Sequence, residues 1–219
     1  MPRTTVAGMV AAMLGIGRDG YYALFAPDTS EIAIEPVSEL RTINMPINTL
    51  STANEHMTRV PRYGRTLKIG LPDPTELRQQ HNYEVLVDPA YRIDLWLSDE
   101  TTYKTLRETL ETGRSHYVPS LGLSEHLAEI EYHGEFDIEP GHTDDVLDVD
   151  STIPEEVNSV IPEPEGSYGI ERSPAYMKAD GRGRTTTGFM AHAYSITAQS
   201  LQVEDLATNQ VDGRTVIFV

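Results

Sequence analysis

A short segment of strict alternation constrains the fold of this chain more than any other feature. In Tyr91–Leu97 the odd positions hold apolar side chains, and the even positions hold Arg92, Asp94 and Trp96. Because successive side chains of a strand point to opposite faces, this pattern predicts a strand with one buried face. The chain must therefore contain a sheet that is covered on one side.

An amphipathic helix is predicted directly after this strand. Ser98 or Asp99 can cap its first turn, and Gly113 can end it in the left-handed conformation. Its apolar stripe has the spacing i, i+3, i+7 and consists of Tyr103, Leu106 and Leu110. A strand followed at once by a helix indicates a domain that mixes the two.

Other segments extend this pattern along the chain. A helix is expected from Thr4 or Thr5 to about Leu14, where Gly15 and Gly17 end it. Further strands are expected at Ile32–Val37, Ala128–His133, Thr186–Ile196, Leu201–Val203 and Thr215–Val219, the last two as a pair. The element order predicts an α+β fold with a mostly antiparallel sheet and helices on one face.

Composition bears on the environment more than on the partner. The 219 residues carry a formal net charge of −17, no cysteine, 14 arginines and only three lysines. An acidic, lysine-poor chain is typical of a cytoplasm at molar salt, where self-repulsion is screened within a few Å. The lack of cysteine also suits a reducing cytoplasm. The apolar stretch before Ile16 is too short to span a bilayer, and we interpret it as a buried helix.

The few basic residues fall in two clusters. The segment Thr58–Lys68 contains Arg59, Arg62, Arg65 and Lys68 around Tyr63 without any acid, and Pro61 and Gly64 favour an extended loop or hairpin over a helix. The second cluster consists of Arg172, Lys178, Arg182 and Arg184, with Asp180 as its only acid and a flexible Gly-Arg-Gly-Arg core.

Arginine supplies a planar fork for phosphate and can stack on bases, as Tyr63 can. At molar salt the gain from counterion release is largely lost, so hydrogen bonds and stacking would have to supply affinity. Both clusters are therefore candidate nucleic-acid contacts, and ordinary surface arginines are the alternative.

Other chemistry finds little support in the sequence. The seven histidines show no metal-ligand spacing, and no nucleophile-elbow, Walker or dinucleotide-binding pattern occurs. The acidic run around Asp144 lacks the glycine and the closing glutamate of a calcium loop. Residues 134–171, which contain no Lys or Arg, are expected to form a solvated acidic insertion or linker. No cofactor and no metal are expected.

Four segments together resemble one family, the fifth CRISPR-associated (Cas) protein family in its haloarchaeal type I-B form. Pro2–Phe25 resembles the first helix of that family. The later blocks, in the same order, are Arg78–Leu95, Tyr117–Ile130 and Glu171–Ile196. The four blocks extend over nearly the whole chain.

The resemblance implies a ferredoxin-like, RRM-type domain of the repeat-associated RNA-binding (RAMP) superfamily. Members cap the 5′ handle of the CRISPR RNA in the Cascade surveillance complex, alongside its backbone and large subunits, in antiviral defence. They carry an inserted thumb hairpin, which here would occupy about residues 41–80 and include the Arg59–Lys68 cluster. The implied division is 1–133 for the domain with its thumb, 134–171 for the acidic segment, and 172–219 for a C-terminal β segment with a basic loop.

Two departures from the family are visible. Members begin with a β-strand before the first helix, so the first strand of the sheet is expected to be missing here and two neighbours to be left unpaired. The glycine-rich loop of the family is represented only by Gly181, Gly183 and Gly188.

Three functions follow as hypotheses. The first is an RNA-binding structural subunit without catalysis, with contacts from both basic clusters and from Arg78. The second is a metal-independent endoribonuclease for CRISPR precursor RNA, in which His81 or Tyr83 activates the ribose 2′-OH. The third is a protein-only scaffold or regulator.

Overall fold

The computed structural model describes residues 1–50, 57–62, 65–70, 78–123, 125–141, 146–162, 166–181 and 183–219. For residues 50, 57–62, 65–70, 78 and 157 it describes the backbone alone. The chain divides into two units, one formed by Met1–Glu39 with Pro89–Val219 and the other by Leu40–Asp88. Each unit is described by itself below.

Helix α1 (Arg3–Met13) forms where the sequence predicts a helix, and it is one wall of the main core. Val6, Val10 and Ala11 are buried against neighbouring elements. The expected threonine cap is wrong, because Pro2 is the N-cap residue and the Thr4 hydroxyl donates to the Pro174 carbonyl instead. The helix ends as predicted, with Gly15 in the left-handed region.

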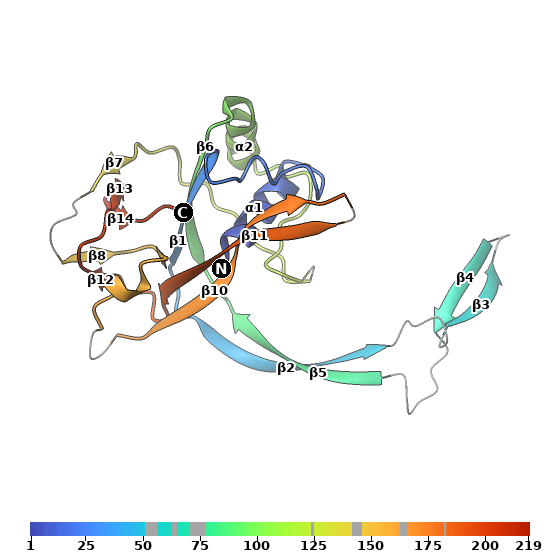
Figure 1. Cartoon of the computed structure of the whole chain (residues 1–219). Helices are drawn as coiled ribbons and strands as arrows, with labels where there is room; N and C mark the ends of the chain where they lie inside the picture. The colour runs from blue at the N-terminus through green and yellow to red at the C-terminus, as the bar shows by residue number, and fades with distance from the viewer. Residues whose placement is uncertain are drawn as a thin grey trace. The chain divides into compact units, whose positions relative to one another are not determined.

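Strands β1 (Ser30–Pro36) and β6 (Tyr91–Leu97) pair antiparallel over their full length, as Figure 1 shows. Ile32 and Ile34 pack against the helical core, while Ala33 packs against Val211 and Val216 on the opposite face. The alternation predicted for 91–97 is therefore confirmed, since the partly buried Tyr91, Ile93 and Leu95 pack on the helical side.

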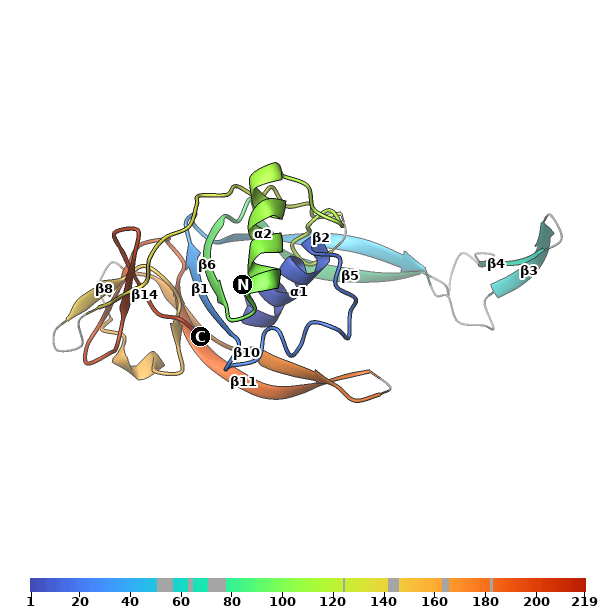
Figure 2. The same cartoon turned by 90° about the horizontal axis from the view of Figure 1, so that it is seen from above.

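Helix α2 (Glu100–Thr112) confirms the predicted caps. The Thr102 amide donates to the Asp99 carboxylate at 2.8 Å, and Gly113 takes a φ of 64°. Leu106 is buried in the same core as α1. Figure 2 shows α1 and α2 beside β1 and β6, so that both helices cover one face of this sheet, as the sequence predicts.

The two edges of this sheet differ. On the edge of β1 away from β6, the Ile32 amide donates to the Val219 carbonyl at 3.0 Å, and the Val219 amide donates to the Ile32 carbonyl at 3.1 Å. Thr152 adds a bond to the Ile34 carbonyl. Among the described residues, β6 has β1 as its sole strand partner.

The ribbon β10 (Tyr168–Ala179) and β11 (Arg184–Ser195) pair antiparallel, with a bulge between Pro174 and Met177. β9 (Ile153–Pro154) bonds to β11 at its far end. β11 confirms the strand predicted for 186–196, but the burial does not alternate along all of it, because Ala193 and Ser195 are buried on the face opposite to His192.

Short strands are frequent in the C-terminal region, where those at 147–149 and 201–203 contribute to a second core and those at 209–211 and 214–216 pack with Ala33. They are β7 (Glu139–Pro140), β8 (Leu147–Val149), β12 (Leu201–Val203), β13 (Asn209–Val211) and β14 (Arg214–Val216), with a 3-10 turn, η2, at Val157–Ser159. Within the segment 134–171, Val149 and Ile153 are fully buried in this core. The expectation that this segment is solvated therefore fails for residues around them.

Two sequence predictions about strands are wrong. Strands at 201–203 and 215–219 were expected to pair, but β12 pairs with β8, and β14 pairs with β13. Asp212 and Gly213 explain the second pairing, because both have positive φ and form the two-residue turn that favours a tight hairpin. The segment 128–133 forms no strand, and the Ala128 amide bonds instead to the Pro119 carbonyl.

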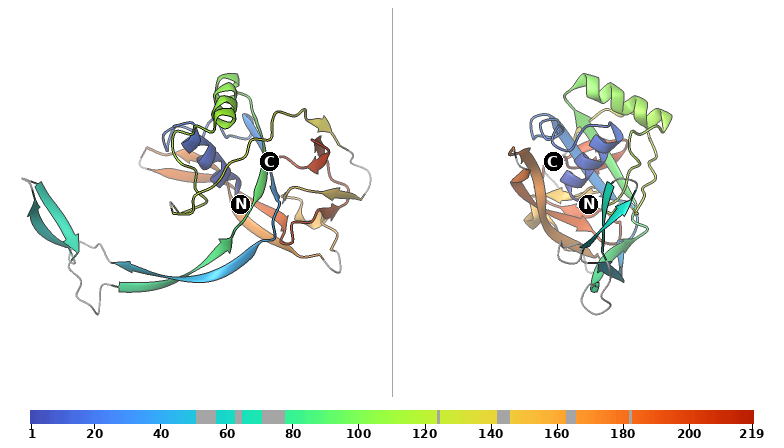
Figure 3. Two further views of the ribbon diagram at one scale, coloured as in Figure 1. Left: turned by 180° about the vertical axis from the view of Figure 1, so that it is seen from behind. Right: turned by 90° about the vertical axis from the view of Figure 1, so that its right-hand side faces the viewer.

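The second unit consists of two antiparallel pairs. β2 (Arg41–Leu50) pairs with β5 (Arg78–Val87) as a long ribbon (Figure 3), and β3 (Met57–Arg62) pairs with β4 (Arg65–Gly70). Ile43, Tyr83 and Leu86 are exposed on the ribbon, so no buried face imposes the alternation by which strands are recognised in a sequence.

The protein is thus mixed α+β with antiparallel pairing, as predicted at the level of class. Within the described ranges, the strands form separate sheets of two or three strands in place of one continuous sheet.

Candidate nucleic-acid interface

The β10–β11 ribbon carries three of the four basic residues predicted for the second cluster. Arg172 and Lys178 lie on β10, Arg184 begins β11, and all three are exposed. Arg182 lies outside the described residues. The register places Arg184 opposite Ala179 and therefore next to Lys178, whereas Arg172 lies further along β10, opposite Ala191.

Asp180, the only acid between these basic residues in the sequence, organises the tip of the ribbon. Its carboxylate accepts hydrogen bonds from the Gly183 amide at 2.8 Å and from the Thr185 hydroxyl at 2.7 Å. Gly181, with a φ of 83°, supplies the left-handed residue of the turn. Across the described part of the chain, Arg172, Lys178 and Arg184 form no ion pair.

Several basic residues elsewhere in this unit have acidic partners, whereas Arg18 and Arg114 form no ion pair with a described residue. Arg214 donates to Glu35 at 2.6 Å and to Asp94 at 2.7 Å, and its pKa is raised by both carboxylates against the opposing effect of burial. The other pairs are Arg92–Asp212, Lys104–Glu100, Arg107–Glu111 and Arg107–Glu135. The ribbon differs from the rest of this unit in that three exposed basic residues without an ion pair to any described residue lie on the same two strands.

Two aromatic residues that sequence analysis missed accompany the ribbon arginines. The Arg172 guanidinium carbon lies 5.0 Å from the ring centroid of Phe189. Arg184 lies near Tyr21. Burial raises the pKa of Tyr21, and the positive charge of Arg184 opposes that rise. The alternation of 186–196 held a signal for Phe189, since it placed this residue opposite the buried His192.

Arg3 is a basic residue of a different kind. It is 5% exposed, and its guanidinium donates to the Phe25 carbonyl at 2.7 Å, to the Ser30 hydroxyl at 2.6 Å and to the Val219 carbonyl at 3.0 Å. Burial lowers its pKa. It also lies over the Tyr176 ring at 4.7 Å. Arg3 therefore connects the start of α1 to the loop before β1 and to the C-terminal residue.

The first predicted cluster lies on β3 and β4 of the second unit. Arg59 is the register partner of Lys68, and Arg62 is the register partner of Arg65. The backbone register thus pairs basic residues with basic residues. In general, like charges directly opposite each other destabilise a strand pair. Tyr63 lies outside the described residues. Arg78 is the register partner of Leu50 at the start of β5.

His81 and Tyr83 share one face of β5. Their ring centroids are 6.3 Å apart in an edge-to-face arrangement, and both side chains are exposed. A surface histidine beside a tyrosine supplies groups that can exchange protons, but the strand offers no described cavity to hold a ribose against them.

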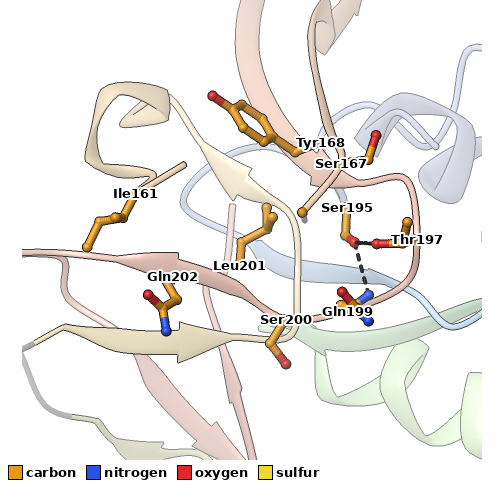
Figure 4. Close-up of a pocket in the computed structure, with 10 residues that line it drawn as sticks. Ile161, Ser167, Tyr168, Ser195, Thr197, Gln199, Ser200, Leu201 and Gln202 are labelled. Carbon is orange, nitrogen blue, oxygen red and sulfur yellow. Dashed lines mark hydrogen bonds between the residues drawn. The ribbon is translucent and has the colours of Figure 1, made fainter. Parts of the chain in front are cut away.

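Cavities and metal-ligand clusters add no other site. One pocket is lined by hydroxyl, amide and apolar groups, and its described lining contains no His, Asp, Glu, Lys or Arg (Figure 4). There the Ser195 hydroxyl accepts a bond from the Gln199 amide at 3.0 Å. Within the described ranges, no three metal-binding side chains converge, and no helix is long and apolar enough to cross a membrane. Asp144 lies outside those ranges.

Comparisons with known proteins return one weak likeness that can be described. No family model and no curated protein matches the chain. A solved structure titled "CRISPR RNA-guided surveillance complex" contains a chain that is 11% identical, with a TM-score of 0.45. The match covers 96% of this chain and 80% of that chain. At this TM-score and identity, the likeness assigns neither a fold nor a function.

Proposed function

We propose that this chain is an RNA-binding structural subunit of a CRISPR surveillance complex, of the fifth Cas family, that caps the 5′ handle of the CRISPR RNA. One observation carries the proposal. In a chain with a net charge of −17, Arg172, Lys178 and Arg184 stand exposed on one ribbon without an acidic partner among the described residues. Unpaired basic residues in an acidic protein favour a polyanionic partner.

The register of β3 and β4 supports the same partner. Two cross-strand pairs of like charge, Arg59 with Lys68 and Arg62 with Arg65, would be relieved by phosphate groups. One of the four sequence blocks that resemble the family, Glu171–Ile196, includes all of β11 and β10 from Glu171 onward. Through that resemblance, the proposal also includes partner subunits, a type I-B complex and a ferredoxin-like core. Through the composition, it includes a salt-rich cytoplasm.

Binding measurements on a pair of matched variants test the proposal. The full chain in molar KCl is titrated against a labelled RNA carrying the CRISPR repeat handle. The variant Arg172→Ala/Lys178→Ala is expected to bind at least about tenfold more weakly, because hydrogen bonds to charged groups contribute about 1.5–3 kcal/mol each.

The control variant is Lys104→Ala/Arg107→Ala, which removes the same charge from α2, where both residues are ion-paired. It should bind within about twofold of the unmodified chain. An equal loss of affinity in the two variants would mean that the ribbon contributes only through its net charge. A lack of binding by the unmodified chain would refute the proposal.

A second candidate function rests on His81 and Tyr83. Their shared face on β5 and their edge-to-face contact favour an endoribonuclease in which one of them accepts the proton of a ribose 2′-OH. Product formation from precursor RNA in the presence of EDTA, abolished by His81→Ala, would establish it. The structural role is preferred, because unpaired positive charge explains binding without any catalytic group.

A further inference from the structure

The β10–β11 ribbon has an outer face whose residues are not all explained by the proposed charge contacts. Strand alternation and register place Arg172, Pro174 and Lys178 of β10 on the same side as Thr185, Thr187 and Phe189 of β11. The opposite side packs toward the main core, since Arg3 of α1 lies over Tyr176 and Met177 packs against that core. We call the first side the outer face.

An exposed aromatic ring is the centre of this outer face. Phe189 is 52% exposed, and no core residue covers it. Its ring carries the Arg172 guanidinium at 5.0 Å from the centroid, so a planar cation and a planar ring lie together at the surface. Both groups are platforms on which nucleobases stack.

The surrounding charge selects the kind of ligand. Lys178 lies further along the same face and forms no ion pair with a described residue. Thr187 is exposed beside Phe189. The acid nearest to Arg172 in the sequence, Glu171, is the register partner of the buried His192 and therefore belongs to the opposite side of the ribbon. Asp180 lies at the tip of this face, where its carboxylate accepts hydrogen bonds from Gly183 and Thr185. A face with a stacking ring and two cations that form no ion pair with a described residue complements a nucleotide better than an apolar protein surface.

We propose that the outer face holds one unpaired nucleotide, whose base stacks on the Phe189–Arg172 pair while Lys178 contacts a neighbouring phosphate. This inference rests on the proposed RNA-binding function and adds a residue and a substrate form to it. A base in a duplex cannot reach the ring without leaving its neighbours, so the face should prefer single strands. Stacking also retains its strength at molar salt, where phosphate contacts lose the gain from counterion release.

The experiment compares Phe189→Ala with Phe189→Trp and Ile170→Ala in the full chain. Ile170 is a suitable control because it is 57% exposed on the same ribbon but cannot stack. Binding of a short single-stranded RNA is measured at two concentrations of KCl, with a duplex of the same sequence as a competitor. Thermal melting of each variant confirms that these surface changes leave the fold intact.

We expect Phe189→Ala to weaken single-strand binding about 5- to 150-fold, by a ratio that is similar at both salt concentrations. Phe189→Trp should bind at least as well as the unmodified chain, and Ile170→Ala should stay within about twofold. Unchanged affinity in Phe189→Ala while the unmodified chain binds RNA would overturn the inference and leave the proposed function intact. An equal loss in Ile170→Ala, or a loss of copurifying protein instead of RNA, would also overturn it. A lack of RNA binding by the unmodified chain would refute both proposals.

Discussion

Replacing Arg3 with methionine is expected to destabilise the folded chain, although Arg3 lies near its N-terminus. Its guanidinium makes hydrogen bonds to groups from three parts of the first unit: Phe25, Ser30 and Val219. Methionine has a similar length but donates none of these bonds. The side chain is buried, so water cannot replace the donors without opening the contact between α1 and β1.

The magnitude follows from what each acceptor loses. The Val219 carbonyl still accepts from the Ile32 amide, and the Ser30 hydroxyl still donates to the Ala26 carbonyl, but the Phe25 carbonyl has no other donor among the described residues. One buried carbonyl without a partner costs about 1–3 kcal/mol. Loss of the contact with the Tyr176 ring adds about 0.5–2 kcal/mol. Burying methionine does not carry the desolvation cost that lowers the pKa of Arg3, and this offsets part of the loss. We therefore expect the free energy of unfolding to fall by about 2–3 kcal/mol.

Urea unfolding in molar KCl, followed by circular dichroism, measures this loss as a lower midpoint at unchanged slope. Arg3→Lys should recover little, since an ammonium cannot match the fork that reaches several oxygens. The exposed Arg114→Met provides the control. Equal midpoints for Arg3→Met and Arg114→Met would refute the reasoning.

Three further predictions concern other residues. Burial lowers the pKa of His192, so the unfolded chain takes up a proton at this residue at higher pH than the folded chain does, and stability should fall as the pH drops below about 6.5. Melting curves recorded at several pH values should show a weaker pH dependence for His192→Gln and an unchanged one for His133→Gln, because His133 is exposed. Gly169→Ala should lower the free energy of unfolding by about 1–3 kcal/mol, and with it the urea midpoint, because its Cβ would lie 2.6 Å from Cζ and from the hydroxyl oxygen of Tyr194. Incubation with precursor RNA should give no cleavage product on a gel; a product lost in His81→Ala would favour the endoribonuclease instead.

The elements that sequence analysis predicted are those with local signals. The strand and helix of residues 91–113 are marked by alternation, by a cap at Asp99 and by the left-handed Gly113, all within a few residues. Such signals depend on the immediate neighbours alone. They can therefore be recognised in the sequence without knowing which strands pair.

Pairing was harder to predict, because it depends on distant segments. Nothing near Leu201 indicates that its strand bonds to β8, and the Asp212–Gly213 turn was overlooked as the signal for the β13–β14 hairpin. The strand expected at 128–133 does not form, because an alternating apolar pattern yields a strand only where another strand is available to pair with it.

The sequence predicted which basic residues form the candidate site, but not how their side chains are arranged. Arg172, Lys178 and Arg184 were singled out by their rarity in an acidic chain, and they share one ribbon. Sequence spacing alone did not show that Arg184 faces Tyr21 while Arg172 lies over Phe189, because the bulge after Pro174 changes the register.

The most direct test of the central claim is the RNA that the chain carries when purified. A tagged form of the chain is isolated from cells in high-salt buffer, and the bound RNA is sequenced, with Arg172→Ala/Lys178→Ala purified in parallel. We predict CRISPR RNAs that begin with a repeat-derived handle, together with other subunits of the complex, and less of this RNA on the variant. Recovery of no repeat-derived RNA on the unmodified chain would contradict the account.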